Sequence, residues 1–238
     1  RIHDTDKLLA VTVIEGIGVL FREKEVEKMK SLLKSLSVDY VVVSFKEYYG
    51  VGMDEIIERV LEKKLTDSPC TFCGVLRRRL LNSVARELGM DKVATAHNLD
   101  DEAQTLLMNI LRGDYTRLPR LYPKAPVLST KFVPRIKPIR KIYEYETTAY
   151  AYMKGFGFQL GHCPYVDLKP SLRGFVRKLL YRIEDIEPGF SLRLVENVAK
   201  ILSKAVTSLK KLPELPVCRL CGEPTSYGRE LCKVCELL

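Results

Sequence analysis

LLAVTVI at residues 8–14 is a continuous apolar run rich in β-branched side chains, and it indicates the fold class. Such a run is typical of a strand that is buried on both faces of a parallel sheet. DYVVVS at 39–44 and DKVATAH at 91–97 predict two further strands. Apolar residues at helical spacing predict helices over 22–36, 53–64, 74–89 and 99–113. Strands that alternate with helices predict an α/β fold with a mostly parallel sheet flanked by helices.

The chain changes character after Gly113. Five prolines predict an irregular passage with one edge strand, namely Pro119, Pro123, Pro126, Pro134 and Pro138. Helices are expected again over 143–154, 171–185 and 190–209, and Pro213 and Pro216 mark a short linker. The sequence therefore predicts a main domain over residues 1–212 and a small C-terminal unit over 213–238.

Composition is that of an ordinary globular protein. Hydrophobic residues make up 46% and charged residues 29% of the 238 residues, which argues against disorder. The sequence has no apolar run of about 18 residues and does not open with a basic segment followed by an apolar one. We therefore expect a cytoplasmic protein with no membrane partner.

The net charge of +9 is concentrated in one part of the chain. Between Lys131 and Arg182 there are eleven Lys and Arg residues against three Asp and Glu residues, a surplus of eight positive charges. A concentration of this kind indicates an electrostatic surface for a polyanion. Arg173, Arg177, Lys178 and Arg182 are spaced to share one broad helix face, which is the candidate surface.

The seven cysteines cannot form a complete set of internal disulfides because their number is odd. C-x-x-C pairs without an export signal predict metal binding in a reducing compartment. CRLC at 218–221 and CKVC at 232–235 are separated by ten residues, and together they supply the four thiolates that tetrahedral zinc prefers. We predict a zinc ribbon closed by Cys218, Cys221, Cys232 and Cys235.

The other three cysteines are one thiolate short of a closed metal site. Cys70 and Cys73 lie in SPCTFCG at 68–74, a predicted loop just before a helix, and the positive end of that helix would stabilise thiolates there. Cys163 follows 90 residues later in GHCPY. A [4Fe–4S] cluster with an open iron, a catalytic zinc, a redox pair and unrelated buried thiols all fit this pattern.

HNLDDEAQT at 97–105 directly follows a predicted buried strand. Ligands of open α/β sheets bind at the carboxyl ends of strands, and adjacent aspartates suit a magnesium ion that bridges nucleotide phosphates. The alternative is an N-terminal capping cluster, because acidic residues are common in a first helical turn. The residues alone leave both interpretations of Asp100 and Asp101 open.

Together these motifs resemble the tRNA 2-thiolation enzymes of the PP-loop ATPase superfamily. The resemblance covers nearly the whole chain and rests on SPCTFCGVLRRRLL at 68–81, ATAHNLDDEAQTLLMNILRGD at 94–114, GHCPY at 161–165 and the terminal C-x-x-C pairs. GHCPY and the two-knuckle tail are most similar to the TtuA type, which thiolates the T-loop uridine at tRNA position 54. Wobble-uridine and cytidine thiolases are the alternatives, and a non-catalytic tRNA-binding subunit is the alternative from another class.

The resemblance implies a HUP-like fold and an ATP-dependent tRNA sulfurtransferase. Such an enzyme adenylates the C2 oxygen of a uridine, so that AMP can leave when sulfur attacks C2. The implied partners are tRNA and a ubiquitin-like sulfur carrier with a C-terminal thiocarboxylate, and a homodimer is the candidate assembly. The implied cofactors are a [4Fe–4S] cluster, ATP, Mg²⁺ and Zn²⁺.

The resemblance also implies roles for individual residues. Asp101 matches the catalytic acidic residue of the family, with Asp100 beside it, and Arg77 and the Ala96 backbone match contacts to ATP. The cluster ligands would be Cys70, Cys73 and Cys163, which leave the fourth iron free to bind sulfur.

One departure from the family pattern concerns the phosphate loop. The SGGKDS motif and the strand before it are absent from the sequence, as is the usual N-terminal zinc ribbon. Without that central strand the buried strands would carry unpaired backbone groups, so we expect roughly 60–80 further residues upstream of Arg1. ATP binding by this chain is accordingly an inference from the resemblance.

Overall fold

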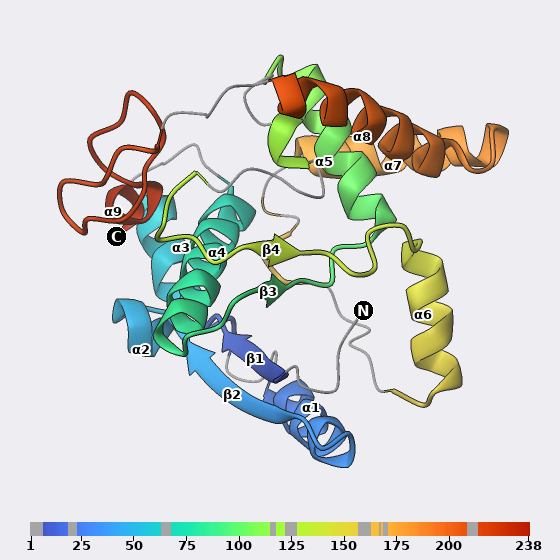
Figure 1. The fold of residues 1–238 in the computed structure, drawn as a ribbon. Helices are drawn as coiled ribbons and strands as arrows, with labels where there is room; N and C mark the ends of the chain where they lie inside the picture. The colour runs from blue at the N-terminus through green and yellow to red at the C-terminus, as the bar shows by residue number, and fades with distance from the viewer. Residues whose placement is uncertain are drawn as a thin grey trace. The chain divides into compact units, whose positions relative to one another are not determined.

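The computed structural model describes residues 7–18, 23–62, 68–114, 118–121, 128–156, 163–166, 168, 171–208 and 214–238. The chain forms two compact units. Figure 1 shows the helices and strands of both, coloured along the chain. The first contains residues 1–84, 155–169 and 233–238, and the second contains residues 85–154 and 170–232. The predicted boundary at residues 212 and 213 lies outside the described residues, so that division of the chain stays a prediction.

The first unit is built on a parallel βαβ motif. Strand β1 (Leu9–Ile14) and strand β2 (Asp39–Ser44) pair in parallel from Leu9 opposite Asp39 to Ile14 opposite Ser44. Helix α1 (Glu23–Ser35) is the crossover between them, as Figure 1 shows. Both strands and the helix follow the apolar patterns of the sequence, so these predictions are confirmed.

A close backbone contact shapes the loop after β1. Gly16 has a φ of +73°, and a Cβ at this position would lie 3.0 Å from the Gly52 Cα atom. Glu15 O and Gly16 O accept hydrogen bonds from the backbone N–H groups of Met53 and Asp54, which open helix α3 (Met53–Glu62). The loop is therefore fixed against the first turn of α3.

The sequence analysis missed the short helix α2 (Phe45–Tyr49). It opens with a capping box in which Ser44 Oγ accepts from the Glu47 N–H and a Glu47 carboxylate oxygen accepts from the Ser44 N–H. The S-x-x-E pattern at 44–47 is a recognised start signal that could have predicted this helix.

Helix α4 (Pro69–Glu87) begins earlier than the sequence pattern suggested. The predicted loop over 68–74 is wrong, because Pro69 occupies the first helical position, where a missing N–H has no cost. Its buried face carries Phe72, Leu76, Leu80 and Val84, which pack into one core with Phe45, Met53, Ile56 and Ile57. Cys70 and Cys73 consequently lie in the first two turns of a helix instead of in a loop.

The second unit contains a minimal parallel pair of strands. Strand β3 (Val93–Ala94) pairs with β4 (Arg135–Ile136), so the strand predicted over 91–97 is reduced to two residues. Pro134 and Pro138 flank β4 and offer no backbone N–H to extend the ladder. The α/β class with parallel strands is confirmed, although the described strands form two separate pairs instead of one sheet.

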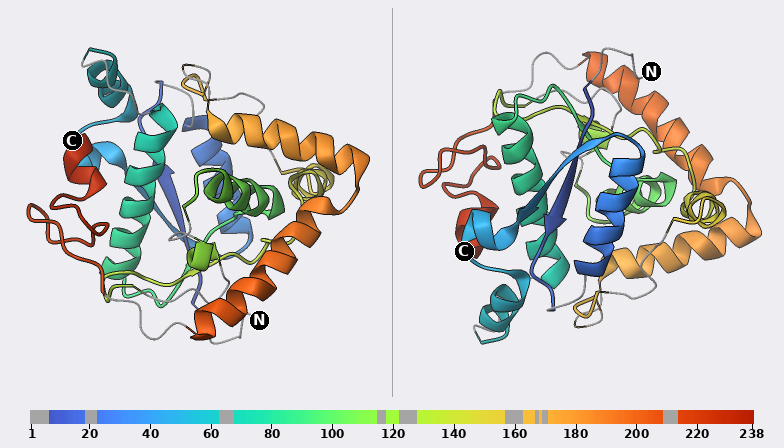
Figure 2. Two further views of the ribbon diagram at one scale, coloured as in Figure 1. Left: turned by 90° about the horizontal axis from the view of Figure 1, so that it is seen from above. Right: turned by 90° about the horizontal axis from the view of Figure 1, so that it is seen from below.

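Helices make up most of the second unit. Helix α5 (Leu99–Leu111) lies between α7 (Leu172–Ile186) and α8 (Phe190–Ser208), which diverge from a common turn in both views of Figure 2. Its core consists of Leu99, Ala103, Val176, Leu180 and Val195. The unit also contains the 3₁₀ helix η1 (Leu118–Leu121) and helix α6 (Glu144–Met153).

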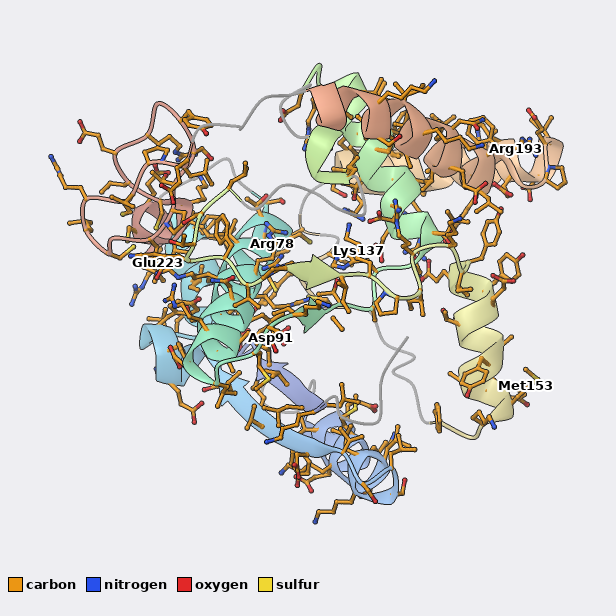
Figure 3. All side chains as sticks on the ribbon, viewed as in Figure 1. Arg78, Asp91, Lys137, Met153, Arg193 and Glu223 are labelled. Atoms are coloured by element: carbon orange, nitrogen blue, oxygen red, sulfur yellow. The ribbon has the colours of Figure 1, made fainter. Side chains whose placement is uncertain are left out.

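A buried ion network ties α5 to the segment after β4. Glu102 of α5 is only 4% exposed, and its carboxylate contacts the Lys137 ammonium and the Arg140 guanidinium. Lys137, labelled in Figure 3, directly follows β4. Two cations at one buried carboxylate compensate its desolvation, so the network holds the start of α5 next to the β3–β4 pair.

The chain ends in a loop-rich segment over 214–232 and helix α9 (Lys233–Leu237). Val234 and Leu237 of α9 pack against the core of the first unit. Among the described residues, no helix has the length and apolar character needed to cross a membrane.

Candidate functional site

Cys70 and Cys73 are one helical turn apart at the start of α4. Cys70 is exposed, whereas Cys73 is partly buried against the core of the first unit. Both sulfurs therefore lie near the N-terminal end of the helix.

Cys163 returns to the same core, although it lies 90 residues further along the chain. It packs against the same hydrophobic cluster as Cys73, and the Val166 N–H donates to the Cys163 carbonyl in a turn. The Tyr165 hydroxyl donates to Asp54 Oδ1 at 2.5 Å. Burial is the larger cause and this hydrogen bond the second of a rise in the pKa of Tyr165 to about 12, so the hydroxyl keeps its proton. Sequence distance could not have shown that Cys163 and Cys73 pack against the same core, and a shared site for them stays a prediction.

Arg77 connects Cys73 to a buried carboxylate. Its Nη2 atom donates to Cys73 Sγ at 3.0 Å and lies 2.8 Å from Glu15 Oε1. Burial alone lowers the pKa of Arg77, but the thiolates of Cys73 and Cys163 and the nearby carboxylate outweigh it and raise the pKa. The guanidinium therefore stays charged beside the cysteines, where it stabilises thiolates. Glu15 was not singled out from the sequence.

The three sulfurs of Cys70, Cys73 and Cys163 are not gathered as closely as thiolates that share one zinc ion. Among the described residues, Cys70, Cys73 and Cys163 do not form a group whose sulfurs all lie within 4.8 Å of one another. Thiolates that share one zinc ion lie about 3.8 Å apart, as follows from tetrahedral geometry with Zn–S bonds of about 2.3 Å. A cluster distributes its cysteine ligands over separate irons and accepts wider spacing. Three thiols at wider spacing are compatible with an iron–sulfur cluster, and their role as its ligands stays a prediction.

The four C-terminal cysteines do form a compact group. The sulfurs of Cys218, Cys221, Cys232 and Cys235 all lie within 4.8 Å of one another. Cys221 Sγ and Cys232 Sγ are 3.6 Å apart, close to the spacing that a shared zinc ion requires. Burial raises the pKa of Cys218, but backbone N–H groups of Cys232, Cys221 and Leu220 donate to its sulfur and lower the pKa to about 6. These donors favour the thiolate form that binds a metal.

Ion pairing anchors the ribbon within the second unit. Glu223, labelled in Figure 3, is 5% exposed, and both of its carboxylate oxygens accept from the Arg86 guanidinium at 2.7 and 3.3 Å. Lys131 Nζ donates to the Gly222 carbonyl at 2.6 Å. No local pattern in the sequence indicates these contacts, because the partners are more than 90 residues apart.

The acidic residues at the start of α5 cap helices. Asn98 Oδ1 accepts from the Asp101 N–H at 2.9 Å, and Asp101 Oδ2 accepts from the Asn98 N–H at 3.4 Å. Asp100 Oδ2 accepts from the Glu144 N–H at 2.7 Å, at the start of α6. Burial raises the pKa of Asp100 above its ordinary value despite that hydrogen bond. The capping interpretation therefore applies to both aspartates.

The Asp101 carboxylate has a second oxygen that takes no part in these capping hydrogen bonds. Its side chain is 36% exposed, and its second oxygen, Oδ1, lies 3.3 Å from Arg173 Nη1. Ala96 is exposed in the segment between β3 and α5. Both residues are thus accessible to a ligand, and their roles toward ATP and Mg²⁺ stay predictions.

The predicted basic face of α7 is partly engaged in internal contacts. Arg173 also donates to Gln104 and Thr105 of α5, and Arg177 pairs with Glu144 at 2.8 Å. Lys178 and Arg182 are exposed. The face predicted for a polyanion is therefore divided, with the first two arginines joining helices and the other two available to a partner.

Comparison with known proteins assigns the family. A tRNA 2-thiolation protein named NcsA from Haloferax volcanii is 32% identical over 241 residues, which cover 98% of this chain and 72% of that protein. The chain belongs to the tRNA 2-thiolation protein family. Another relative, cytoplasmic tRNA 2-thiolation protein 1 of Chlamydomonas reinhardtii, is 37% identical over 235 residues, covering 97% of this chain and 62% of the relative. No family model matches the chain.

A solved structure supports the same assignment for this tRNA 2-thiolation protein. The U34-tRNA thiolase NcsA from Methanococcus maripaludis, described with its [4Fe–4S] cluster, superimposes with a TM-score of 0.75 at 32% identity, covering 97% of this chain and 70% of that one. The resemblance found in the motifs is thus confirmed at the level of tRNA thiolases. These relatives do not single out the T-loop type.

Proposed function

We propose that this protein is a tRNA sulfurtransferase that converts the wobble uridine to 2-thiouridine. The observation that carries the proposal is the likeness to a U34-tRNA thiolase with its [4Fe–4S] cluster, together with three cysteines collected in one compact unit. The wobble uridine was the alternative to the T-loop uridine in the sequence analysis. The named substrate of the solved relative favours it.

Cys70, Cys73 and Cys163 would hold the cluster. A [4Fe–4S] cluster with three protein thiolates keeps one iron that is open to the sulfur being transferred. Arg77 supports this assignment because its guanidinium lies at Cys73 and stabilises negative charge on the sulfur. Glu15 holds the other side of the same guanidinium and keeps it directed there.

Activation of the uridine would use ATP. Transfer of AMP from ATP to the C2 oxygen would release pyrophosphate and make that oxygen part of a good leaving group. Attack by a sulfur nucleophile at C2 would then expel AMP, which carries that oxygen away. Asp101, whose carboxylate is accessible beside Arg173, is the candidate to hold Mg²⁺ at the phosphates, with Asp100 behind it. Ala96 and Arg77 are the proposed ATP contacts.

The proposed partners follow from the same chemistry. tRNA is the substrate, the exposed Lys178 and Arg182 are candidate phosphate contacts, and a thiocarboxylated ubiquitin-like carrier is the proposed sulfur donor. Zinc at the C-terminal cysteines would stabilise the ribbon. A homodimer and a cytoplasmic location complete the proposal, the latter in keeping with the name of the algal relative.

Mass spectrometry of tRNA nucleosides tests the function. A host strain that lacks its own wobble thiolase should regain 2-thiouridine at position 34 when it receives the full-length gene of this protein. The Cys163→Ala variant should restore none, whereas Cys235→Ala should reduce the yield only through stability. Sulfur at position 54 would identify the T-loop enzyme instead. Parental activity of Cys163→Ala would refute the three-thiolate assignment.

A further inference from the structure

The turn that carries Cys163 has no regular secondary structure of its own. Among the described residues, 163–166 lie outside any helix or strand, and the Val166 N–H to Cys163 carbonyl bond is their internal hydrogen bond. A single turn of this kind does not determine where a sulfur sits relative to a distant helix. The position of Cys163 against the core must therefore depend on contacts beyond the turn.

Asp54 supplies a fixed point for this turn. Its Oδ1 atom accepts from the Tyr165 hydroxyl at 2.5 Å, and its Oδ2 atom accepts from the Gly18 N–H at 2.8 Å. Asp54 is itself held, because its own N–H donates to the Gly16 carbonyl and its neighbour Met53 is 1% exposed. A hydrogen bond to an ionised carboxylate is stronger than one between neutral groups.

The same loop serves the other cysteines. Glu15, three residues before Gly18, contacts the Arg77 guanidinium that donates to Cys73. The loop over 15–18 is thus linked to Cys73 through Arg77 and to the Cys163 turn through Asp54. All residues of these two connections belong to the first unit, and Cys73, Cys163 and Tyr165 pack against its core.

We infer that the Tyr165–Asp54 hydrogen bond is a latch that positions Cys163 as the third thiolate beside the α4 cysteines. Asp54 and Tyr165 are positioning residues, since they act on the turn and hold no iron themselves. Without the latch, the turn is free to leave the core, Cys163 becomes more exposed, and the three-thiolate site loses one ligand. The assignment of that ligand to a cluster rests on the proposed function, whereas the latch itself does not.

The latch can be tested without any cluster. The full chain is reduced, stripped of metal with a chelator and given a short pulse of iodoacetamide, and alkylation of each cysteine is read by peptide mass spectrometry. Tyr165→Phe and Asp54→Ala should each raise the alkylation rate of Cys163 by about tenfold, the loss expected for one charge-assisted hydrogen bond. Cys70 is exposed in the parent and serves as the internal standard, with an unchanged rate.

Two controls separate a latch from general loosening. Tyr49 packs against the same core and donates its hydroxyl to the Leu76 carbonyl at 2.9 Å, so Tyr49→Phe removes a comparable hydrogen bond elsewhere in the unit. It should leave the Cys163 rate at the parental value. The double variant Tyr165→Phe/Asp54→Ala should react no faster at Cys163 than Asp54→Ala, because both changes remove one interaction.

Anaerobic reconstitution then provides the cluster readout. Tyr165→Phe should retain less iron than Tyr49→Phe and show a weaker cluster absorption, with an unchanged unfolding midpoint. A parental Cys163 alkylation rate in Tyr165→Phe, or faster alkylation of all seven cysteines together, would overturn the latch. A parent protein that binds no iron would refute the cluster proposal and leave the alkylation result standing.

Discussion

Asn98 and Asp101 hold each other's backbone N–H groups at the start of α5, while Asp101 also faces Arg173 with its other oxygen. One carboxylate can therefore serve both the helix and a ligand. Sequence motifs do not separate these two roles, because a capping residue and a magnesium ligand have the same side chain. Variants of Asp101 and of its capping partner Asn98 can distinguish the capping role from the ligand-binding role.

Asp101→Ala and Asn98→Ala should each lower the free energy of unfolding by about 1 kcal/mol, since both break the same capping box. Only Asp101→Ala should abolish tRNA thiolation in the full-length protein, because it alone removes the carboxylate. Denaturant unfolding and nucleoside mass spectrometry measure the two effects. Parental thiolation by Asp101→Ala would remove this residue from the proposed mechanism.

Asp100 provides a prediction about pH. Burial raises its pKa above the ordinary 3.8, so its contribution to stability is full below that value and is lost as pH rises through the folded-state pKa. Asp100→Asn stays neutral and can still accept from the Glu144 N–H. The free energy of unfolding of the variant, minus that of the parent, should therefore increase as pH rises from about 3.8 toward neutrality. A difference that decreases over this range would contradict the assignment.

Helix α7 illustrates how an element can share its charges between folding and binding. Its first two arginines contact α5 and α6, and this leaves the charge available to RNA nearer the end of the helix. Helical periodicity correctly predicts a helix that carries four cations along its length. It does not predict which of them find acidic partners, because Glu144 and Asp101 come from other elements.

Lys178→Gln combined with Arg182→Gln should weaken tRNA binding and lower the slope of log affinity against log salt by about 2, if each residue neutralises one phosphate. Arg193→Gln is the matched control, because Arg193 is exposed on the neighbouring helix α8 but is paired with Glu187. It should leave the slope unchanged. Filter binding at several salt concentrations measures both, and equal slopes for all three proteins would place the tRNA surface elsewhere.

On the scale of the whole molecule, each compact unit has its own apolar core. The C-terminal ribbon is held mainly by polar interactions and its cysteines. Its four cysteines lie together, and Glu223 pairs with Arg86. A segment this short buries too little apolar surface to fold by itself, so bound metal should supply much of its stability. The chain spans 72% of its Haloferax relative and 62% of its Chlamydomonas relative.

The parent should bind one zinc ion per chain at these cysteines, and Cys218→Ser should bind much less. Chelation should open residues 214–238 to limited proteolysis while leaving both cores intact. Cys70→Ser removes a thiol outside the ribbon and should keep the zinc. An equal rate of proteolysis of residues 214–238 with and without the chelator would refute a structural zinc site.

The sequence by itself determined the parallel βαβ motif, most helices and the C-x-x-C pairs, because apolar periodicity and short spacings are local properties of a chain. Helix α4 shows where such patterns fail, since Pro69 looks like a loop residue until it is seen to occupy the first turn. Only the tertiary structure brought Cys163 to Cys73, Glu15 to Arg77 and Asp54 to Tyr165. These pairs are 62 to 111 residues apart in the sequence, and the free energy that brings them together comes from burying a shared core that no short segment contains.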